Sequence, residues 1–495
     1  MMLSTKNLSK IHVNQIRFAS FKVPKSYVPS KLNRHIPFKS ALSIWYQSLK
    51  PGRLQTLQDE LTELMLPTEL NSHLVKENKK VRIDNDGNYL NELSFEINNN
   101  SDKPTKHVVF IHGYGASLGC FARNYQIINS LQDRRYNYKV HFLDNISFGL
   151  SSNPKITSSL INGRIPTCPS VKMYDPEPTT KENVYNKYYK LIESYEINKE
   201  EFQEYQDKFI PILNEMEKYY IEAIENWRIE SKIDKIDYLV GHSFGGYWTS
   251  SYAVKYPQNL SNLILLSPVG VERHVHAVTN PIDEIKTQPI KPSVDPTSYH
   301  FLTRMPMLTG KHVINWYTVL PYLPKLLRWL GPWGVSRYYK ERYGKLFKVN
   351  KVTSQLGGAS EVFQHENDLI IGTNKECYLL FEYLYNSTTI GSQSDIYIKY
   401  LLTPCTVSKW PLYDKFTNFF KNSPTSEFRI HFVYGEYDFM NSEAGLKLAE
   451  KINHLSESPI ADFHKIPQGG HNMYLDNPFD TNKMLHNIIQ KQDDL

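Results

Sequence analysis

Short apolar runs alternate with mixed, helix-permissive stretches along much of the chain. Six apolar runs are bounded by polar or glycine-containing turns and predict strands: 93–97, 107–111, 138–143, 236–240, 263–266 and 428–434. Helices are predicted over 41–66, where leucines recur near a 3.6-residue period, and over 214–231, 247–256 and 480–490. Strands that alternate with helices predict an α/β fold with a mainly parallel sheet covered on both faces.

Two segments interrupt this alternation. Residues 155–213 mix Lys, Glu, Asn and Tyr, and they predict a polar, solvent-exposed insertion that is partly helical. Residues 270–400 are rich in Pro, Tyr and Trp and show no strand pattern. The prediction is therefore an α/β core built from 36–269 and 401–495, with a largely helical cap over 270–400.

The positive charge of the chain is concentrated at its start. The first 58 residues contain ten Lys or Arg and no acid, which leaves 47 of the 57 basic residues against all 51 acidic ones. An acid-poor start with Ser and Arg, without the apolar centre of a secretory signal, is typical of a mitochondrial transit peptide, predicted here over 1–35. A disordered basic tail is the alternative. Because the basic excess belongs to this leader, the charge does not indicate a nucleic-acid partner.

Other features of the sequence exclude several classes. No run of about 18 apolar residues occurs, so no transmembrane segment is expected. The four cysteines form no C-x-x-C pair, so neither a zinc site nor a redox motif is indicated. We expect no metal and no cofactor.

The segment Gly241-His242-Ser243-Phe244-Gly245 reads G-x-S-x-G between a predicted strand and a predicted helix. A strand, a sharp turn and a helix form the setting that holds a nucleophilic serine in a strained, accessible position. The flanking glycines leave room for so tight a turn. A pattern of five residues often occurs by chance. Whether Ser243 is a nucleophile therefore depends on whether the sequence also supplies a base and an acid.

A nucleophilic serine needs a base, and the base needs an acid that orients it. The order expected for this fold is serine, acid, histidine. Asp438 follows the predicted strand 428–434, and His471 follows two glycines further on. Glu436 is the alternative acid, but it lies nearer the strand end, so Asp438 is preferred. The predicted catalytic residues are Ser243, Asp438 and His471.

Backbone N–H groups must also stabilise the oxyanion that forms during acyl transfer. One is predicted to come from Phe244, directly after the serine, and the other from Tyr114 in the glycine-rich turn that follows strand 107–111. His242, beside the serine, is expected to fill space rather than to act as a second base.

Residues 304–351 contain ten Lys or Arg and one acid, interleaved with Trp and Tyr. Basic residues with Trp and Leu are typical of a helix that lies on an anionic lipid surface. A solvated helix over ordinary buried aromatics is the alternative. The candidate lipid-contacting residues are Lys325, Arg328, Trp329, Trp333, Arg337 and Lys340.

Six segments carry a resemblance to a known family: 112–116, 144–152, 225–228, 241–247, 435–440 and 471–476. They are similar to the motifs of the α/β-hydrolase family that contains lysophospholipid hydrolases, a lipid-droplet lipase co-activator and a fungal mitochondrial cardiolipin deacylase. One departure is Ser147, which stands where the family has a glycine. The segment 471–476 is similar to the family's His-x4-Asp motif, which is linked to acyltransferase activity.

The resemblance implies a serine phospholipase that deacylates an anionic phospholipid, with cardiolipin as the expected substrate and monolysocardiolipin as the product. It would sit peripherally on the mitochondrial inner membrane. An acyl-CoA-dependent lysophosphatidic acid acyltransferase using the same site is the alternative. The histidine of the His-x4-Asp motif is also the expected base, so the motif is not independent evidence for transfer. A third hypothesis, a non-catalytic lipid-binding regulator, is opposed by Ser243, because the co-activator branch lacks the catalytic serine.

Overall fold

A computed structural model describes most of residues 36–493. The described ranges are 36–66, 74–99, 102–132, 134–163, 193–286, 288–301, 322–346, 370–402, 407–425 and 428–493, with a few residues between 165 and 174. The predicted transit peptide at 1–35 lies outside the described residues.

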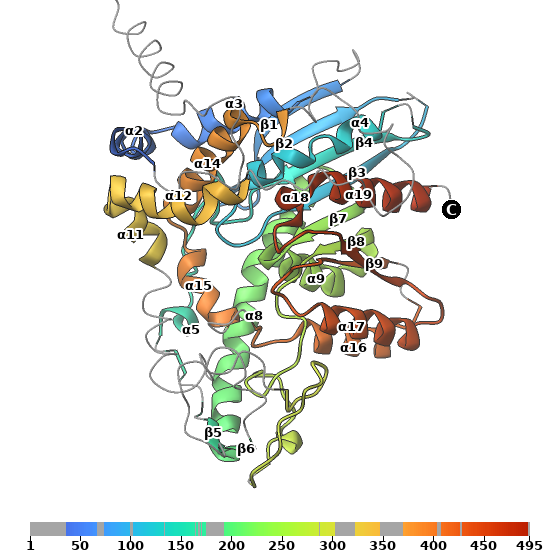
Figure 1. Cartoon of the computed structure of the whole chain (residues 1–495). Helices are drawn as coiled ribbons and strands as arrows, with labels where there is room; N and C mark the ends of the chain where they lie inside the picture. The colour runs from blue at the N-terminus through green and yellow to red at the C-terminus, as the bar shows by residue number, and fades with distance from the viewer. Residues whose placement is uncertain are drawn as a thin grey trace, which may run out of the picture.

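An eight-stranded sheet runs through the molecule in the order β1-β2-β4-β3-β7-β8-β9-β10 (Figure 1). Neighbouring strands from β4 to β10 are parallel, whereas β1 and β2 add to one edge in antiparallel register. The strands are β1 (Leu74–Arg82), β2 (Tyr89–Ile97), β3 (Thr105–Ile111), β4 (Asn137–Leu143), β7 (Ile236–His242), β8 (Leu260–Leu266), β9 (Arg429–Gly435) and β10 (Ala461–Ile466).

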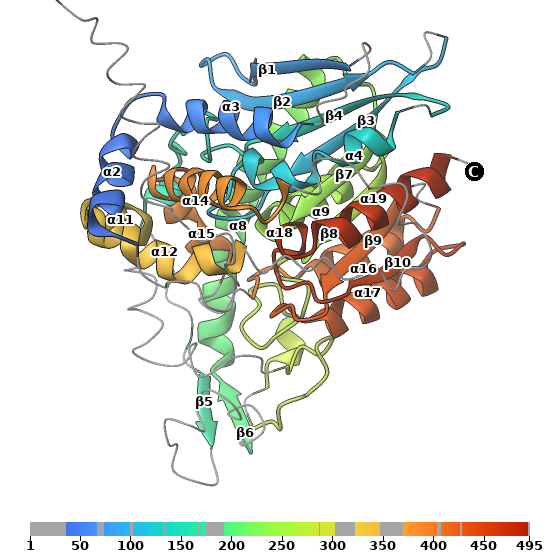
Figure 2. The same ribbon diagram turned by 45° about the horizontal axis from the view of Figure 1, so that its top comes forward.

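Alternate side chains of the sheet enter two apolar cores, one on each face. On β3, Val109 and Ile111 belong to one core, and Val108 and Phe110 belong to the other. The first core is covered by α8 (Lys199–Glu230), α9 (Phe244–Lys255), α16 (Leu412–Asn422) and α17 (Ser442–Leu455). The second is covered by α3 (Arg53–Met65), α14 (Asn374–Thr389) and α19 (Pro478–Asp493) (Figure 2).

The α/β fold class predicted from the sequence is confirmed, and all six predicted strands are present. Two strands of the sheet were not predicted. The sequence of β1 is mostly polar because it forms an exposed edge, with only Val81 buried. At the other edge, β10 buries little more than its two ends. Edge strands such as these lack the apolar pattern on which the prediction rested.

Two helix predictions are corrected by the structure. The helix expected over 41–66 is divided into α2 (Phe38–Ser48) and α3, because Gly52 adopts a φ of 75° between them. The helix expected from residue 214 begins at Lys199. Its first half buries Tyr205 and Phe209 in the first core and Phe202 in a smaller separate cluster, so this part of the expected polar insertion 155–213 is packed rather than solvent-exposed.

The described part of 322–401 is helical: α11 (Leu323–Trp329), α12 (Pro332–Leu346), α14 and α15 (Ser394–Leu401). By contrast, 270–301 is largely irregular, with one short 3-10 turn at Ile282–Glu284. α12 packs against α2 and α14, and α15 packs against α8. The smaller elements are η2 (Leu118–Asn124), α4 (Ile127–Ser130), α5 (Ser159–Asn162), η3 (Pro257–Asn259), α18 (Met473–Asp476) and the hairpin of β5 (Val171–Tyr174) and β6 (Ser194–Ile197).

Candidate active site

Ser243 occupies a strained turn between the end of β7 and the start of α9. Its backbone angles, a φ of 52° and a ψ of −112°, lie outside the regions that residues other than glycine normally adopt. The turn is also tightly packed, because a Cβ at Gly245 would collide with the carbonyl of His112 and one at Gly241 would collide with Thr249. The sequence pattern therefore forms the sharp strand-to-helix turn that it predicted.

The structure brings Ser243, His471 and Asp438 together in one hydrogen-bonded row. The Ser243 hydroxyl lies 3.0 Å from Nε2 of His471, and Nδ1 of His471 lies 3.2 Å from Oδ1 of Asp438. These residues follow β7, β10 and β9, so the carboxyl ends of three parallel strands supply them. The Asp438 side chain is buried and that of His471 remains partly accessible.

The environment of Asp438 favours its ionised form. Burial alone would raise the pKa of this carboxyl, but hydrogen bonds and the nearby His471 outweigh that effect and lower the pKa below its ordinary value. The Met440 N–H donates to Oδ1 at 3.0 Å. Glu436 instead accepts the backbone N–H of Gln468 at 2.8 Å on an exposed loop, which agrees with the preference for Asp438 as the partner of His471.

Sequence reasoning missed Ser267, which follows β8. Its hydroxyl donates a hydrogen bond to Oδ2 of Asp438, the oxygen that His471 leaves free. Ser267 has a φ of 46°, and its N–H is held by the Val433 carbonyl of the neighbouring β9 at 2.7 Å. The position of this serine directly after a predicted strand was visible in the sequence, but its contact with Asp438 depends on the pairing of β8 with β9.

Two side chains fix the loop that carries His471. His242 donates from Nε2 to the backbone carbonyl of His471 at 2.9 Å, and Asp476 accepts the Gly470 N–H at 3.1 Å. Burial and the nearby His471 lower the pKa of His242 to about 3, so it stays neutral near pH 7. His242 thus packs beside the serine as a structural neighbour, and Asp476 of the His-x4-Asp motif acts on the loop backbone.

The glycine-rich turn after β3 lies directly against the serine. A Cβ at Gly113 would stand 3.0 Å from the Cβ of Ser243, and the rings of Tyr114 and Phe244 meet edge to face at 6.2 Å. The two residues predicted to supply oxyanion N–H groups are therefore neighbours. The Tyr114 hydroxyl donates to Asp395 of α15 at 2.8 Å, which ties this turn to the cap.

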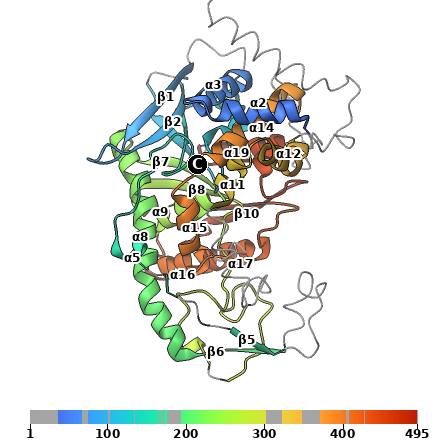
Figure 3. The same cartoon turned by 90° about the vertical axis from the view of Figure 1, so that its left-hand side faces the viewer.

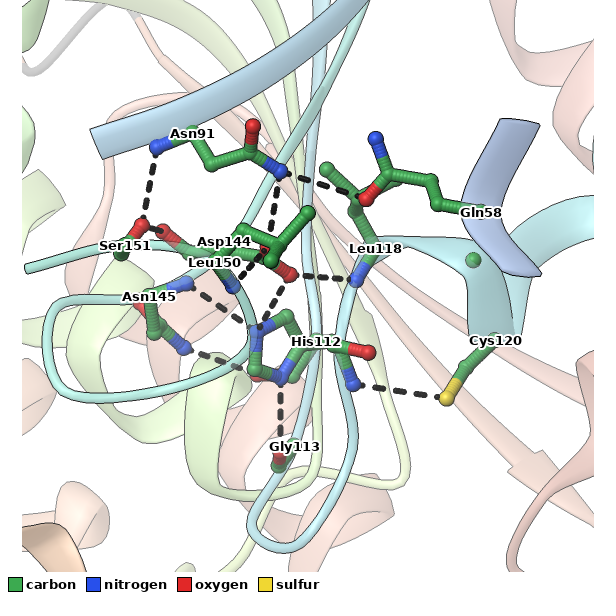
Figure 4. A network of polar contacts seen from close by, with 12 residues as sticks. Gln58, Asn91, His112, Gly113, Leu118, Cys120, Asp144, Asn145, Leu150 and Ser151 are labelled. Atoms are coloured by element: carbon green, nitrogen blue, oxygen red, sulfur yellow. Dashed lines mark hydrogen bonds and ion pairs between the residues drawn. The ribbon is translucent and has the colours of Figure 1, made fainter. Parts of the chain in front are cut away.

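A buried polar network holds the start of the same turn, at His112 (Figure 4). The Asp144 carboxyl accepts the N–H groups of Leu118 and Leu150 at 2.7 and 2.8 Å and the amide of Asn91 at 2.9 Å. His112 is held by Asn145, whose N–H donates to its Nε2 at 3.0 Å. Complete burial raises the pKa of Asp144 to about 6.

Ser147, in the loop after β4, adopts a φ of 70°. This left-handed conformation explains the glycine that the family has at that position. The serine is retained with its hydroxyl bonded to that of Tyr219 on α8.

The residues predicted to contact lipid lie on α11 and α12. Lys325, Trp329, Trp333, Arg337 and Lys340 are exposed. The prediction is wrong for Arg328, which is half-buried and donates to the carbonyl of Ser48 at the end of α2. Because a bonded guanidinium caps the helix end, Arg328 joins two helices rather than facing solvent.

One group of described residues offers three possible metal ligands at the edge of the sheet: His431, Asp462 and His464. Nδ1 of His431 lies 3.3 Å from Nε2 of His464 and 3.4 Å from Oδ2 of Asp462. The positive charges of Arg429 and Lys491 face the group, and the buried Nε2 of His431 lacks a hydrogen-bond acceptor. Metal-bound histidines normally have such an acceptor, so the group fits a metal ion poorly.

No helix within the described ranges is long and apolar enough to cross a bilayer.

The eight-stranded sheet and the serine on its turn define a class of protein. Residues 106–296 match the family model described as the alpha/beta hydrolase fold, so the chain has the α/β-hydrolase fold that the sequence motifs implied.

Its relatives are known proteins of fungi, plants and animals. Protein ECM18 of Saccharomyces cerevisiae is 26% identical over 465 residues, covering 92% of this chain and 85% of that protein. The 1-acylglycerol-3-phosphate O-acyltransferase ICT1 of the same yeast is 28% identical over 284 residues, which are 56% of this chain and 61% of ICT1, less than two thirds of its length. The human 1-acylglycerol-3-phosphate O-acyltransferase ABHD5 is 22% identical over 83% of this chain and 84% of its own length.

Proposed function

We propose that this protein is a serine phospholipase that removes an acyl chain from an anionic glycerophospholipid. The observation that carries the proposal is the hydrogen-bonded row from Ser243 through His471 to Asp438. A serine hydroxyl is a weak nucleophile at neutral pH unless an oriented base removes its proton. The strained turn presents this hydroxyl where an ester carbonyl can approach it.

In the proposed reaction, Ser243 Oγ attacks the acyl carbonyl while Nε2 of His471 takes its proton. Asp438, ionised because of its lowered pKa, accepts the hydrogen bond from Nδ1 and stabilises the imidazolium. The N–H groups of Tyr114 and Phe244 hold the oxyanion, each contributing about 3–4 kcal/mol. His471 then protonates the leaving lysophospholipid, and water, deprotonated by His471, releases the fatty acid.

The lipid class rests on charge. The acid-free leader at 1–35 favours mitochondrial import, and the basic, aromatic segment of the cap favours an anionic lipid surface. Cardiolipin is the anionic phospholipid that the family resemblance implies for that compartment. We therefore propose cardiolipin as substrate, monolysocardiolipin and a fatty acid as products, and a peripheral place on the mitochondrial inner membrane.

A second candidate function uses the same serine. ICT1 and human ABHD5 are named 1-acylglycerol-3-phosphate O-acyltransferases, and this favours transfer of an acyl group from acyl-CoA to lysophosphatidic acid. An acyl-enzyme serves both reactions, because the acceptor that reaches it decides the product. Asp476 does not separate them, since it bonds the backbone N–H of Gly470 rather than facing Ser243.

Purified protein incubated with cardiolipin tests the first function, and protein with acyl-CoA and lysophosphatidic acid tests the second. We expect monolysocardiolipin and free fatty acid from the wild type, and none from Ser243→Ala. Ser250→Ala is the matched control and retains activity: Ser250 is a buried serine two turns along α9 from Ser243, and its hydroxyl bonds the Gly246 carbonyl. Phosphatidic acid formed only with acyl-CoA, without release of fatty acid from cardiolipin, would replace the first function with the second.

A further inference from the structure

One face of the molecule leaves many large apolar side chains in solvent. Among the residues that the structure describes, eighteen large apolar side chains are exposed, and ten of them lie in just two segments, 38–49 and 322–333. Such a concentration marks an interaction surface, because single exposed apolar residues are normally scattered. Figures 2 and 3 show the helices that carry them, α2, α11 and α12, side by side.

On α2 the exposed side chains form a continuous stripe. Phe38, Leu42, Tyr46 and Leu49 recur at intervals of four, four and three residues, which places them on one side of the helix. The opposite side, which includes Ile44, is buried against the protein. A helix at the surface of a soluble domain normally turns polar residues outward. The outer stripe of α2 therefore stays largely uncovered by the described residues, with Phe38 56%, Leu42 41%, Tyr46 59% and Leu49 47% exposed.

A second stripe on α11 and the start of α12 continues the first. Leu326 and Trp329 lie one turn apart on α11, Trp333 lies in the first turn of α12, and the two tryptophans are 80% and 71% exposed. The rings of Phe38 and Trp333 meet edge to face at 6.0 Å, so the stripes touch. Indole rings at this exposure are typical of the boundary between water and lipid.

Reciprocal hydrogen bonds hold the two helices in register. The indole N–H of Trp45 donates to the carbonyl of Arg328 at 2.9 Å, and the Arg328 guanidinium donates to the carbonyl of Ser48. Arg328 therefore positions the surface rather than contacting a partner itself.

Charge identifies the partner. The segments 38–50 and 322–342 contain seven Lys or Arg and one acid, Glu341, which pairs with Arg337. The exposed cations of the same two segments are Lys39, Lys50, Lys325, Arg337, Lys340 and Arg342. Apolar side chains surrounded by cations complement an anionic bilayer, where the rings enter the interface and the cations meet headgroups.

We propose that α2, α11 and the first turns of α12 form one docking surface for an anionic lipid bilayer. The proposal deepens the proposed function and rests on it for the reason to dock. It adds α2, which the sequence did not indicate, to the predicted lipid-contacting segment.

The docking surface is also linked, through α14, to the turn beside the active serine. Tyr338 of α12 lies 3.2 Å from the hydroxyl of Thr388 at the end of α14, and that hydroxyl donates to the Gly115 carbonyl at 2.9 Å. The chain just after α14 also packs closely against α11, because a Cβ at Gly391 would stand 2.6 Å from the Lys325 side chain. A protein docked by these helices would therefore present the oxyanion turn near the lipid surface.

Sedimentation with vesicles tests the proposal. The full chain carrying Ser243→Ala is used, so that no lipid is consumed, with vesicles of phosphatidylcholine alone or of equimolar phosphatidylcholine and phosphatidylglycerol. We expect binding to the anionic vesicles. Lys39→Ala/Lys325→Ala/Lys340→Ala should weaken it about a hundredfold, from about fivefold for each cation. Leu42→Ser/Tyr46→Ser on α2 and Trp329→Ser/Trp333→Ser on the cap should each weaken it about tenfold.

Matched controls lie elsewhere on the surface: Val75→Ser/Leu446→Ser and Lys76→Ala/Lys218→Ala/Lys421→Ala, all exposed positions. They should bind like the parent chain, and unchanged thermal unfolding verifies that each variant is folded. Parent-like binding by the α2 variant would overturn the composite surface, and equal weakening by the controls would overturn the site altogether. Binding does not depend on Ser243, so loss of lipid turnover alone would count against the proposed function and not against docking.

Discussion

At the scale of single residues, the conformation of Ser243 and the partner of His471 decide whether this fold can do acyl chemistry. Ser243 keeps a strained backbone, and its hydroxyl faces an imidazole whose other nitrogen meets Asp438. A strained non-glycine residue is retained only where the surroundings impose it, here the close packing of Gly113 and Gly245 around the turn.

Substitutions of Asp438 and Glu436 distinguish which acid is the partner of His471. Asp438→Asn removes the charge that orients and stabilises the imidazolium, so kcat/KM should fall on the order of 10⁴-fold. Glu436→Gln changes only an exposed loop contact and should alter kcat/KM less than about twofold, within the usual range for surface substitutions. Ester hydrolysis by the two purified variants measures this. A larger loss for Glu436→Gln would reverse the assignment.

Ser243 and Asp438 were predictable because each follows a recognisable strand, and His471 because it follows two glycines at the expected place in the chain order. Ser267 was not, although it also follows a predicted strand. Its bond to Asp438 exists because β8 pairs with β9, and pairing between strands so far apart in the chain leaves no local pattern. The prediction that Arg328 contacts lipid was wrong for a related reason. Its hydrogen bond to the Ser48 carbonyl depends on where α2 packs, which no local pattern shows.

At the scale of elements, Arg123 joins three segments that surround the site. Its guanidinium lies fully buried on η2, pairs with Glu376 of α14 at 2.8 Å and donates to the Leu475 carbonyl in α18 at 2.6 Å. α18 directly follows the loop of His471. One buried cation thus connects α14 of the cap, η2 of the core and α18, which follows the loop that carries His471.

Removal of that cation should cost stability. Arg123→Ala leaves Glu376 charged and buried without its partner, so the free energy of unfolding should fall by about 3–5 kcal/mol. Urea denaturation followed by circular dichroism measures the change. Arg82→Ala, which removes exposed contacts to two loop carbonyls, is the control and should change it by less than about 0.5 kcal/mol. An equal effect of both variants would mean that the buried pair does not hold these elements together.

The first half of α8 shows what element prediction lacked. Phe202, Tyr205 and Phe209 have helical spacing, but they lie in a strongly charged stretch and before Pro211, which normally interrupts a helix. The apolar side of this helix is buried against the rest of the protein, and that packing outweighs the local pattern.

At the scale of the whole molecule, seven of the described histidines are buried, and five of these have a strongly lowered pKa and stay neutral: His112, His242, His274, His276 and His431. Burial lowers the pKa of each, to about 4 for His112 and His274 and to about 3 for the other three. The unfolded chain takes up protons near the ordinary value of 6.5, so acid favours the unfolded state. Asp144, with its pKa raised to about 6, acts in the opposite direction, as do Asp237, Asp395 and Asp414, whose pKa values burial also raises. The five histidines outweigh these carboxyls because their ordinary pKa of about 6.5 lies between about pH 5 and about pH 7.5.

Stability should therefore decrease as the pH falls from about 7.5 to about 5. Each of the five histidines contributes about 2 kcal/mol to that decrease. Even half of their combined effect is comparable to the whole free energy of unfolding of an ordinary domain. Urea denaturation at the two pH values measures the difference. A free energy of unfolding that is the same at both would show that these side chains are not buried in their neutral form.

The central claim is that Ser243 is a nucleophile activated by His471, and covalent labelling tests it most directly. A fluorophosphonate forms a stable adduct with an activated serine, and mass spectrometry of the digested protein locates it. We predict one adduct per chain, on the peptide that contains Ser243, with labelling absent in Ser243→Ala and strongly slowed in His471→Ala. An unlabelled Ser243, or labelling that proceeds at the wild-type rate without His471, would contradict the account.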